Sequence, residues 1–288
     1  MAAGAVVAFE VAPGPAPVHP SAPAPPRQAT PNSSAPSRSA NPPTKPPNPT
    51  ALAADFAQLQ ARLHAKTGVV LGPVGAGSDA PVTLGDWSSG PAWSTIKVAL
   101  VIAAMRQQNT GQVTKPMIAA ITESDNAAAE SIWEGLGEPT TAAAKVEAVL
   151  RETGDPTTVQ SQKVRPEYTA FGQTDWSLAH QALFLSAVAC DPRDQPVLTL
   201  MGEVENDQKW GLGVLPNTKI KGGWGPSLSG RYLVRQIGIL PTPKGLTVVA
   251  VAAEPDSGSF PDGIQALTEL AKWLQAHVDV LPAAQCKA

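Results

Sequence analysis

The sequence predicts an α+β protein whose single antiparallel sheet of five strands is flanked by helices from both ends of the folded domain. Three observations support this fold class. Helical and strand-like patterns follow one another in the order helix, two strands, several helices, three strands and helix. The apolar run Val98–Met105 indicates a helix that is buried on all sides. Residues 1–50 hold 14 of the 30 prolines and cannot form a core, so residues 51–288 are expected to form the folded domain.

The folded domain is expected to begin with an amphipathic helix at residues 52–66, where apolar side chains recur at spacings of four, three and four. Gly68 is expected to end this helix. Two short strands follow at Val69–Val74 and Pro81–Trp87, joined by a glycine-rich turn.

The middle of the domain has helical patterns. The segment Phe171–Trp176 is expected to end a loop and to start the last of these helices, with Thr174 as its N-cap. The helices are expected at residues 94–108, 115–123, 127–136, 140–153 and 175–189.

Strand patterns return in the last third of the chain. Trp210–Gly213 is expected to form a turn ahead of them. Because the two early strands and the three late strands share one sheet, the helices between them form a separate lobe. The expected late elements are strands at Lys219–Gly223, Tyr232–Leu240 and Leu246–Ala253, with turns at Gly225–Gly230 and Pro241–Gly245, and a closing helix at 261–277.

The composition excludes several classes of protein. The 288 residues include 21 basic and 24 acidic side chains and show no basic stripe, which argues against a nucleic-acid partner. No apolar run approaches the roughly 20 residues of a membrane-spanning helix. The four histidines do not cluster and the cysteines lie far apart, so no metal site is expected. Cys190 and Cys286 form one disulfide if the protein is exported and remain free thiols if it is not.

Two interpretations of the N-terminal head remain open. Residues 1–12 are small and apolar but lack the basic start of a signal peptide. They are either the truncated stub of a signal or membrane anchor, or a plain disordered terminus. Residues 13–50 combine Pro, Ala, Ser, Asn and Thr, a composition typical of a semi-rigid polyproline spacer.

Three short motifs carry the chemistry of the chain. Taken alone, each motif has an ordinary interpretation. The first pattern is common and is then a helix cap followed by a solvated lysine, the second is rarer and is then a loop or N-cap cluster, and the third is then a turn signal. Their conjunction, in this order and on these predicted elements, indicates a catalytic site. The motifs are Ser94-Thr95-Ile96-Lys97 at the start of the buried helix, Ser124-Asp125-Asn126 between two helices, and Lys221-Gly222-Gly223 on the first late strand.

The residue types suit nucleophilic attack on a carbonyl group. Ser94 and Lys97 share one helix face, so a neutral Lys97 can take the serine proton. The N–H groups at a helix start stabilise the oxyanion that attack creates. A second cation, Lys221, favours the neutral form of Lys97 by repulsion. Ser124 can relay a proton to a leaving nitrogen, and Asn126 offers a donor and an acceptor to a substrate amide.

The motif set resembles that of the serine β-lactamase and penicillin-binding protein superfamily, nearest to class A β-lactamases, over about residues 52–280. The resemblance implies a β-lactamase/transpeptidase-like fold and acyl transfer through a covalent serine ester, without a metal or an organic cofactor. The implied catalytic residues are the nucleophile Ser94, its base Lys97, the proton shuttle Ser124 and the carboxylate-binding Lys221. The implied substrate-binding residues are Asn126, Gly222, Gly223 and Trp224, where the N–H groups of Ser94 and Trp224 form the oxyanion hole.

One departure from the family pattern lies in the third motif. Gly222 stands where the family has threonine or serine, so a hydroxyl that contacts the substrate carboxylate is missing. Ser227 or Ser229 is a candidate to replace it.

Two further departures concern the helical lobe and deacylation. The glutamate of the family's omega loop has no clear counterpart, and Glu167 is its only candidate, with a solvated loop carboxylate as the favoured alternative. Only 30 positions separate Ser94 from Ser124, so the lobe is expected to be reduced and the cleft more open. Three tryptophans near the motifs either line the cleft or pack in the core: Trp87, Trp93 and Trp224.

The expected function is therefore that of a serine acyl-enzyme hydrolase acting on D-alanyl peptides or β-lactams and slow in deacylation. Two alternatives remain: a non-catalytic binding module of the cell envelope on the same fold, and an esterase that does not need Lys221. We expect a monomer that is secreted or held in the cell envelope, with membrane anchoring through a missing N-terminal segment as one possibility.

Overall fold

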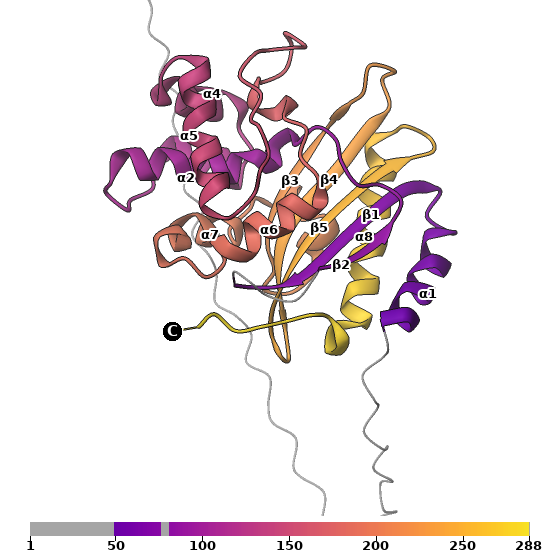
Figure 1. Ribbon diagram of the computed structural model, residues 1–288. Helices are drawn as coiled ribbons and strands as arrows, with labels where there is room; N and C mark the ends of the chain where they lie inside the picture. Colours follow the sequence, from indigo (N-terminus) through magenta and orange to yellow (C-terminus); the bar gives the residue numbers. More distant parts are fainter. Residues whose placement is uncertain (1–48, 76–80, 288) are drawn as a thin grey trace, which may run out of the picture. The chain divides into compact units, whose positions relative to one another are not determined.

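The computed structural model describes residues 49–75 and 81–287 (Figure 1). The proline-rich head up to residue 48, with the suggested signal or anchor stub, lies outside the described residues, as does most of the glycine-rich turn between the first two strands. In the described part of the chain, no helix is both long enough and apolar enough to span a membrane.

The centre of the fold is the predicted antiparallel sheet, and its five strands are confirmed. The early pair lies at one edge and the late strands continue the sheet, in the order β2-β1-β5-β4-β3 (Figure 1). β1 pairs with β5, so the two ends of the domain meet in the middle of the sheet. The strands are β1 (Ala65–Pro73), β2 (Val82–Gly85), β3 (Lys219–Pro226), β4 (Tyr232–Thr242) and β5 (Gly245–Pro255).

Helices cover both faces of the sheet, which explains why its central strands are buried along almost their whole length. Alternate side chains of β1 point to opposite faces of the sheet and pack in two separate hydrophobic cores. Val69 and Leu71 pack with the terminal helices, and Val70 packs with the helical lobe. The terminal helices are α1 (Pro49–Gln60) and α8 (Phe260–Ala276). The other side carries α2 (Lys97–Gln108), α3 (Lys115–Thr122), α4 (Asn126–Leu136), α5 (Pro139–Glu152), α6 (Leu178–Val188) and α7 (Gln195–Met201).

The first helix boundary was predicted wrongly. α1 ends at Gln60, and the chain enters β1 at Ala65, so Gly68 lies inside a strand instead of ending a helix. Gly68 is needed there because a Cβ atom would collide with the backbone carbonyl of Trp87. A helical pattern of apolar side chains runs through residues 52–63, but pairing of Ala65 with β5 overrides it.

The predicted cap of the last lobe helix is also wrong. α6 begins at Leu178, and the side chain of Ser177 caps it by accepting a hydrogen bond from the His180 N–H group. The Thr174 hydroxyl instead accepts from the Gln160 N–H group at 3.0 Å and so ties the preceding loop. The short helix α7 was not predicted.

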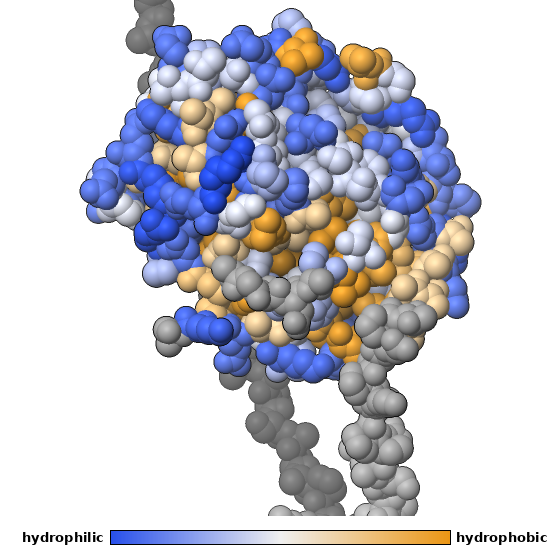
Figure 2. Space-filling model, in the orientation of Figure 1, coloured by the Kyte–Doolittle hydropathy of each residue, from blue (hydrophilic) through white to orange (hydrophobic). Residues whose placement is uncertain are grey.

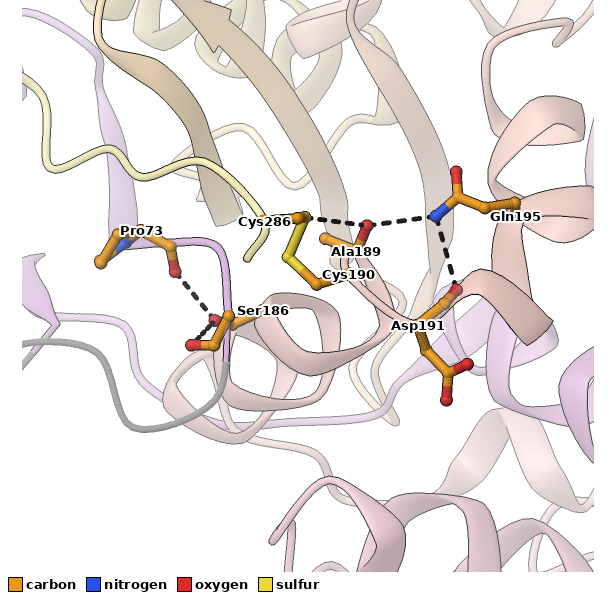
Figure 3. The surroundings of a disulfide bond; sticks show 8 residues. Pro73, Ser186, Ala189, Cys190, Asp191, Gln195 and Cys286 are labelled. Atoms are coloured by element: carbon orange, nitrogen blue, oxygen red, sulfur yellow. Dashed lines mark hydrogen bonds between the residues drawn. A yellow bond between two sulfur atoms is a disulfide. The ribbon is translucent and has the colours of Figure 1, made fainter. Parts of the chain in front are cut away.

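The two cysteines are joined, which settles the open question of their state. The Cys190–Cys286 disulfide links the end of the α6 segment to the C-terminal segment (Figure 3). That segment also pairs with the start of β5, where the Leu246 N–H group donates to the Ala284 carbonyl at 2.7 Å. The C-terminal segment is therefore fastened to the sheet and to the lobe.

Candidate active site

Ser94 lies in a short 3₁₀ turn, Trp93–Ile96, that leads directly into α2. Trp93, immediately before it, has φ 47°, a left-handed conformation that is strained for a non-glycine residue. The turn is fastened by Thr95, whose hydroxyl donates to the Ala92 carbonyl at 2.6 Å and accepts from Gln181 Nε2 at 2.7 Å. These contacts hold the turn in place, so that the partly exposed Ser94 lies directly before a buried helix.

Lys97 is completely buried and points at the second motif. Its Nζ atom donates to the Ser124 carbonyl at 2.5 Å, to the Asp125 carbonyl at 3.2 Å and to Asn126 Oδ1 at 2.7 Å. The predicted contact with the hydroxyl of Ser94 is not among the hydrogen bonds of the described residues. In this arrangement Lys97 is bound to the 124–126 segment.

Burial sets the charge state of the two lysines. Burial lowers the pKa of Lys97 to about 7, and the negative charge of Asp125 opposes this change. Burial also lowers the pKa of Lys221 well below its usual value, with the charge of Lys97 as the second cause. The sequence predicted repulsion between the two lysines, and repulsion is present as a contribution at Lys221, but desolvation is the main cause at Lys97.

Ser124 connects the first and third motifs. Its carbonyl binds Lys97, while its hydroxyl accepts a hydrogen bond from Lys221 Nζ at 2.7 Å. Its φ of 61° is again left-handed and strained. Asp125 does act as the N-cap of α4, since its carboxylate accepts from the Ala128 N–H group at 2.7 Å. The same three residues therefore provide the ordinary helix cap and the contacts to both lysines.

The N–H group of Trp224 faces the open edge of β3. The Ser227 N–H group donates to the Arg231 carbonyl, so that pair is hydrogen-bonded across the hairpin. Hydrogen-bonded and non-hydrogen-bonded pairs alternate in an antiparallel ladder. Trp224 opposes Val234 three pairs further along, which is a non-hydrogen-bonded position. Its N–H group thus points away from β4, in the plane of the sheet, toward the unpaired edge of β3.

The same stretch of β3 lies against the serine turn. A Cβ atom on Gly223 would stand 2.9 Å from the Ser94 backbone nitrogen and 3.0 Å from the Ala92 carbonyl oxygen. Glycine is required here because the strand backbone approaches the turn so closely. The N–H group of Trp224 follows directly, so two backbone donors, those of Ser94 and Trp224, are brought near each other.

Gly222 is buried beneath an aromatic cluster. A Cβ atom at this position would lie 3.0 Å from Trp210, whose ring packs against Trp224 at 5.8 Å. The ring of Trp210 crowds the place where the family has a side chain. The two candidate replacements, Ser227 and Ser229, bond each other at 2.9 Å in an exposed turn and do not line the cleft.

A cleft of about 380 Å³ opens in front of Ser94. Trp93 and Trp224 line it, as one reading of the tryptophans predicted, but Trp87 is buried and donates to Glu254 at 2.9 Å. Hydrophilic residues cover most of the helical lobe on the face drawn in Figure 2. The lining comprises Trp93, Ser94, Asn126, Ala127, Glu130, Lys163, Glu167, Tyr168, Thr169, Trp224, Gly225, Pro226 and Tyr232.

The loop between α5 and α6 forms one wall of this cleft. Its two ends are joined by a hydrogen bond of 2.6 Å from Trp176 Nε1 to the buried carboxylate of Asp155. Arg165 ties the loop to β3 by donating to the Pro226 carbonyl at 2.5 Å. Glu167 accepts from the same Arg165 at 3.3 Å and its side chain is 57% exposed. Glu167 thus lines the cleft but is turned toward a neighbouring arginine and solvent.

Sequence reasoning missed two charged residues of the cleft. Glu130 lies on α4, and Lys163 Nζ contacts its Oε1 atom at 2.9 Å from the loop. Glu130 could have been found, because it follows Asn126 by four residues and so shares its helix face. Lys163 carries no such signal, since only the folded loop brings it there.

In the described residues, no three or more His, Cys, Asp or Glu side chains come together as a possible metal site. No protein-family model matches the sequence, and no curated protein matches it.

Solved structures, in contrast, are similar over most of the chain. One is an ancestral class A β-lactamase, with 20% identity and a TM-score of 0.61, covering 78% of this chain and 99% of its own. Another is the TLA-3 extended-spectrum β-lactamase, with 15% identity and a TM-score of 0.64, covering 80% and 99%. A third is a β-lactamase from Streptosporangium roseum, with 17% identity and a TM-score of 0.59, covering 79% and 98%. The chain therefore has the serine β-lactamase-like fold.

Proposed function

We propose that this chain is a serine acyl-enzyme hydrolase that acts on D-alanyl peptides or β-lactams and deacylates slowly. The observation that carries the proposal is the convergence of three motifs far apart in the sequence. Lys97 binds Asn126, Lys221 binds the hydroxyl of Ser124, and Ser94 and Asn126 open into the same cleft. The β-lactamase-like fold supports the same reaction class by analogy.

In the proposed acylation, a neutral Lys97 takes the proton of the Ser94 hydroxyl as Oγ attacks the substrate carbonyl carbon. The N–H groups of Ser94 and Trp224 stabilise the oxyanion. Ser124 then gives its hydroxyl proton to the leaving nitrogen as the C–N bond breaks, and the proton that Lys97 took from Ser94 passes to Ser124, so that Lys97 is neutral again. Catalytic hydrogen bonds are often incomplete in the free enzyme, so Lys97 is expected to turn toward Ser94 when substrate enters.

Of the proposed substrate-binding residues, Asn126 and Trp224 line the cleft, whereas Lys221, Gly222 and Gly223 lie buried beside it. Asn126 binds the amide of the substrate. Lys221 is bonded to Ser124 and binds the substrate carboxylate, whose negative charge would favour the charged form that burial of Lys221 disfavours in the free protein. Gly223 allows the strand to come close to the serine turn. Gly222 has no side chain to offer the substrate, and the ring of Trp210 crowds the space that a side chain would occupy. Binding of the carboxylate is therefore expected to be weaker than where a hydroxyl is present.

Slow deacylation is proposed because Glu167, the one loop carboxylate the sequence offered, is exposed and paired with Arg165, so the loop itself supplies no well-positioned base and any assistance must come from elsewhere in the cleft. We further propose an extracytoplasmic location, which the Cys190–Cys286 disulfide supports, because disulfides persist in oxidising compartments. The head at residues 1–50 then serves as a spacer in a monomeric protein that is secreted or attached to the cell envelope.

The test is incubation with a fluorescent penicillin, followed by intact mass measurement, beside a Ser94→Ala control. A stable adduct that the control lacks supports a penicillin-binding peptidase, and turnover without an adduct supports a β-lactamase. If neither adduct nor turnover appears, and a simple ester is not hydrolysed, the enzyme proposal is wrong and the binding-module alternative stands. Hydrolysis of simple esters that survives in Lys221→Ala would instead support the esterase.

A further inference from the structure

A second carboxylate, that of Glu130, lines the same cleft as the proposed nucleophile. Glu130 lies on α4, one turn after Asn126, and both residues line the same cleft as Ser94. Residues four apart on a helix project from one face. Asn126 is held at the start of α2 by the 2.7 Å hydrogen bond that Lys97 Nζ donates to its Oδ1 atom. Glu130 is therefore placed beside the substrate position by a helix that is already tied to the catalytic lysine.

The contacts of Glu130 leave one carboxylate oxygen available. Oε1 lies 2.9 Å from Lys163 Nζ, and the side chain is 25% exposed. Among the described residues, Oε2 has no hydrogen-bond partner. The carboxylate is thus oriented by a cation on one side and has a free oxygen that can bind a water molecule.

We propose that Glu130 is the general base of deacylation, an inference that rests on the proposed function. A water molecule on Oε2 attacks the carbonyl carbon of the Ser94 ester while Glu130 takes one of its protons. The oxyanion then collapses, the bond from carbon to Ser94 Oγ breaks, and the proton passes from Glu130 to Oγ. The products are the free acid and the restored serine.

Glu130 suits this role better than Glu167, the other carboxylate that lines the cleft. Oε1 of Glu167 accepts from Arg165 Nε and Nη2, each at 3.3 Å, and 57% of the Glu167 side chain is exposed, so solvent competes with substrate water for this carboxylate. Glu130 is less exposed and comes from a regular helix, which holds a side chain more rigidly than a loop does.

The experiment measures the lifetime of the adduct. Protein is acylated with a penicillin, excess penicillin is removed, and loss of the adduct is followed by intact mass in wild type, Glu130→Gln, Glu167→Gln and the control Glu134→Gln. Glu134 lies one turn further along α4, is exposed and does not line the cleft. We expect the adduct to persist about 100-fold longer in Glu130→Gln, the loss typical of a general base, and to keep the wild-type lifetime in Glu134→Gln.

A second variant separates catalysis from structure. In Glu130→Ala, added sodium formate should restore deacylation in proportion to its concentration, because formate can supply the missing base. Formate should not change the adduct lifetime in Glu134→Ala, and a purely structural role of Glu130 predicts no rescue.

Two outcomes would overturn the inference and are distinguishable from each other. If wild type forms no adduct with any penicillin and does not turn it over, the proposed function fails and takes the role of Glu130 with it. If wild type is acylated but the lifetime in Glu130→Gln is unchanged, or only Glu167→Gln prolongs it, the proposed function stands and Glu130 is not the base.

Discussion

Acylation of Ser94 should depend on pH through the neutral form of Lys97. Burial lowers the pKa of Lys97 to about 7, so a large share of the side chain can accept a proton near neutrality. For a single group with that pKa, the neutral fraction is about one tenth at pH 6 and about nine tenths at pH 8. The acylation rate constant should therefore rise about tenfold between these two values and level off above pH 8.

The assay is the second-order rate constant for labelling by a fluorescent penicillin between pH 5.5 and 8.5. Asp125→Asn is the informative variant, because the charge of Asp125 raises the pKa of Lys97 and its removal should move the midpoint to lower pH. Asparagine still caps a helix well, so α4 should remain intact. A rate that is flat between pH 6 and 8, or a midpoint that moves upward in Asp125→Asn, would refute the reasoning.

The same shift has a consequence for stability. The folded pKa of Lys97, about 7, lies below the usual value of 10.5, so the unfolded chain binds more protons between these two pH values. The free energy of unfolding should thus rise with pH across this window, by up to about 1.4 kcal/mol per pH unit from this group. In Lys97→Met that contribution should disappear, which urea unfolding at pH 7 and pH 9 would show.

Three further predictions concern the frame of the site. Cys190→Ser opens a loop with a sequence separation of 96 and should lower the free energy of unfolding by about 4 kcal/mol, measured by calorimetry. Gly222→Thr should cost about 1 to 3 kcal/mol, because the new side chain meets Trp210, and should not speed acylation; urea unfolding and labelling rates check this. Arg165→Ala should speed amide hydrogen exchange in residues 163–169, whereas Arg193→Ala, which removes only exposed ion pairs, should not.

Sequence periodicity predicted most of the helices and strands, because each element leaves a local pattern of apolar side chains. Alternating or continuous apolar runs identified all five strands, and the run at 98–105 identified the buried α2. The end of α1 was missed because pairing of Ala65 with β5 competes with helical periodicity. Local sequence does not report such a long-range competition.

In the candidate site, too, some features could be predicted from the sequence and others could not. The conjunction of the three motifs, with the family resemblance that it implies, predicted that Lys97 and Lys221 lie in one neighbourhood, and the charge of Lys97 does contribute to the lowered pKa of Lys221. The ion pair of Glu130 and Lys163 depends on where a long loop folds back, and the crowding of Gly222 depends on Trp210, which lies twelve residues earlier in a turn. These features arise from tertiary packing, and no spacing rule could have predicted them.

The surroundings of the two buried lysines support the proposed catalytic role over a purely structural one. A buried ion that serves stability is normally paired, as Asp194 is with Arg106 Nη2 at 2.7 Å. Lys97 and Lys221 are each at most 1% exposed, yet among the ion pairs of the described residues neither contacts a carboxylate. Asp125, the nearest candidate, instead uses its carboxylate to cap α4. Two unpaired ammonium groups in one buried space are costly for folding, and this cost disfavours their charged forms. A lowered pKa of this kind is what the proposed role of Lys97 requires, because a base that accepts the proton of Ser94 must be neutral for a large share of the time near neutral pH.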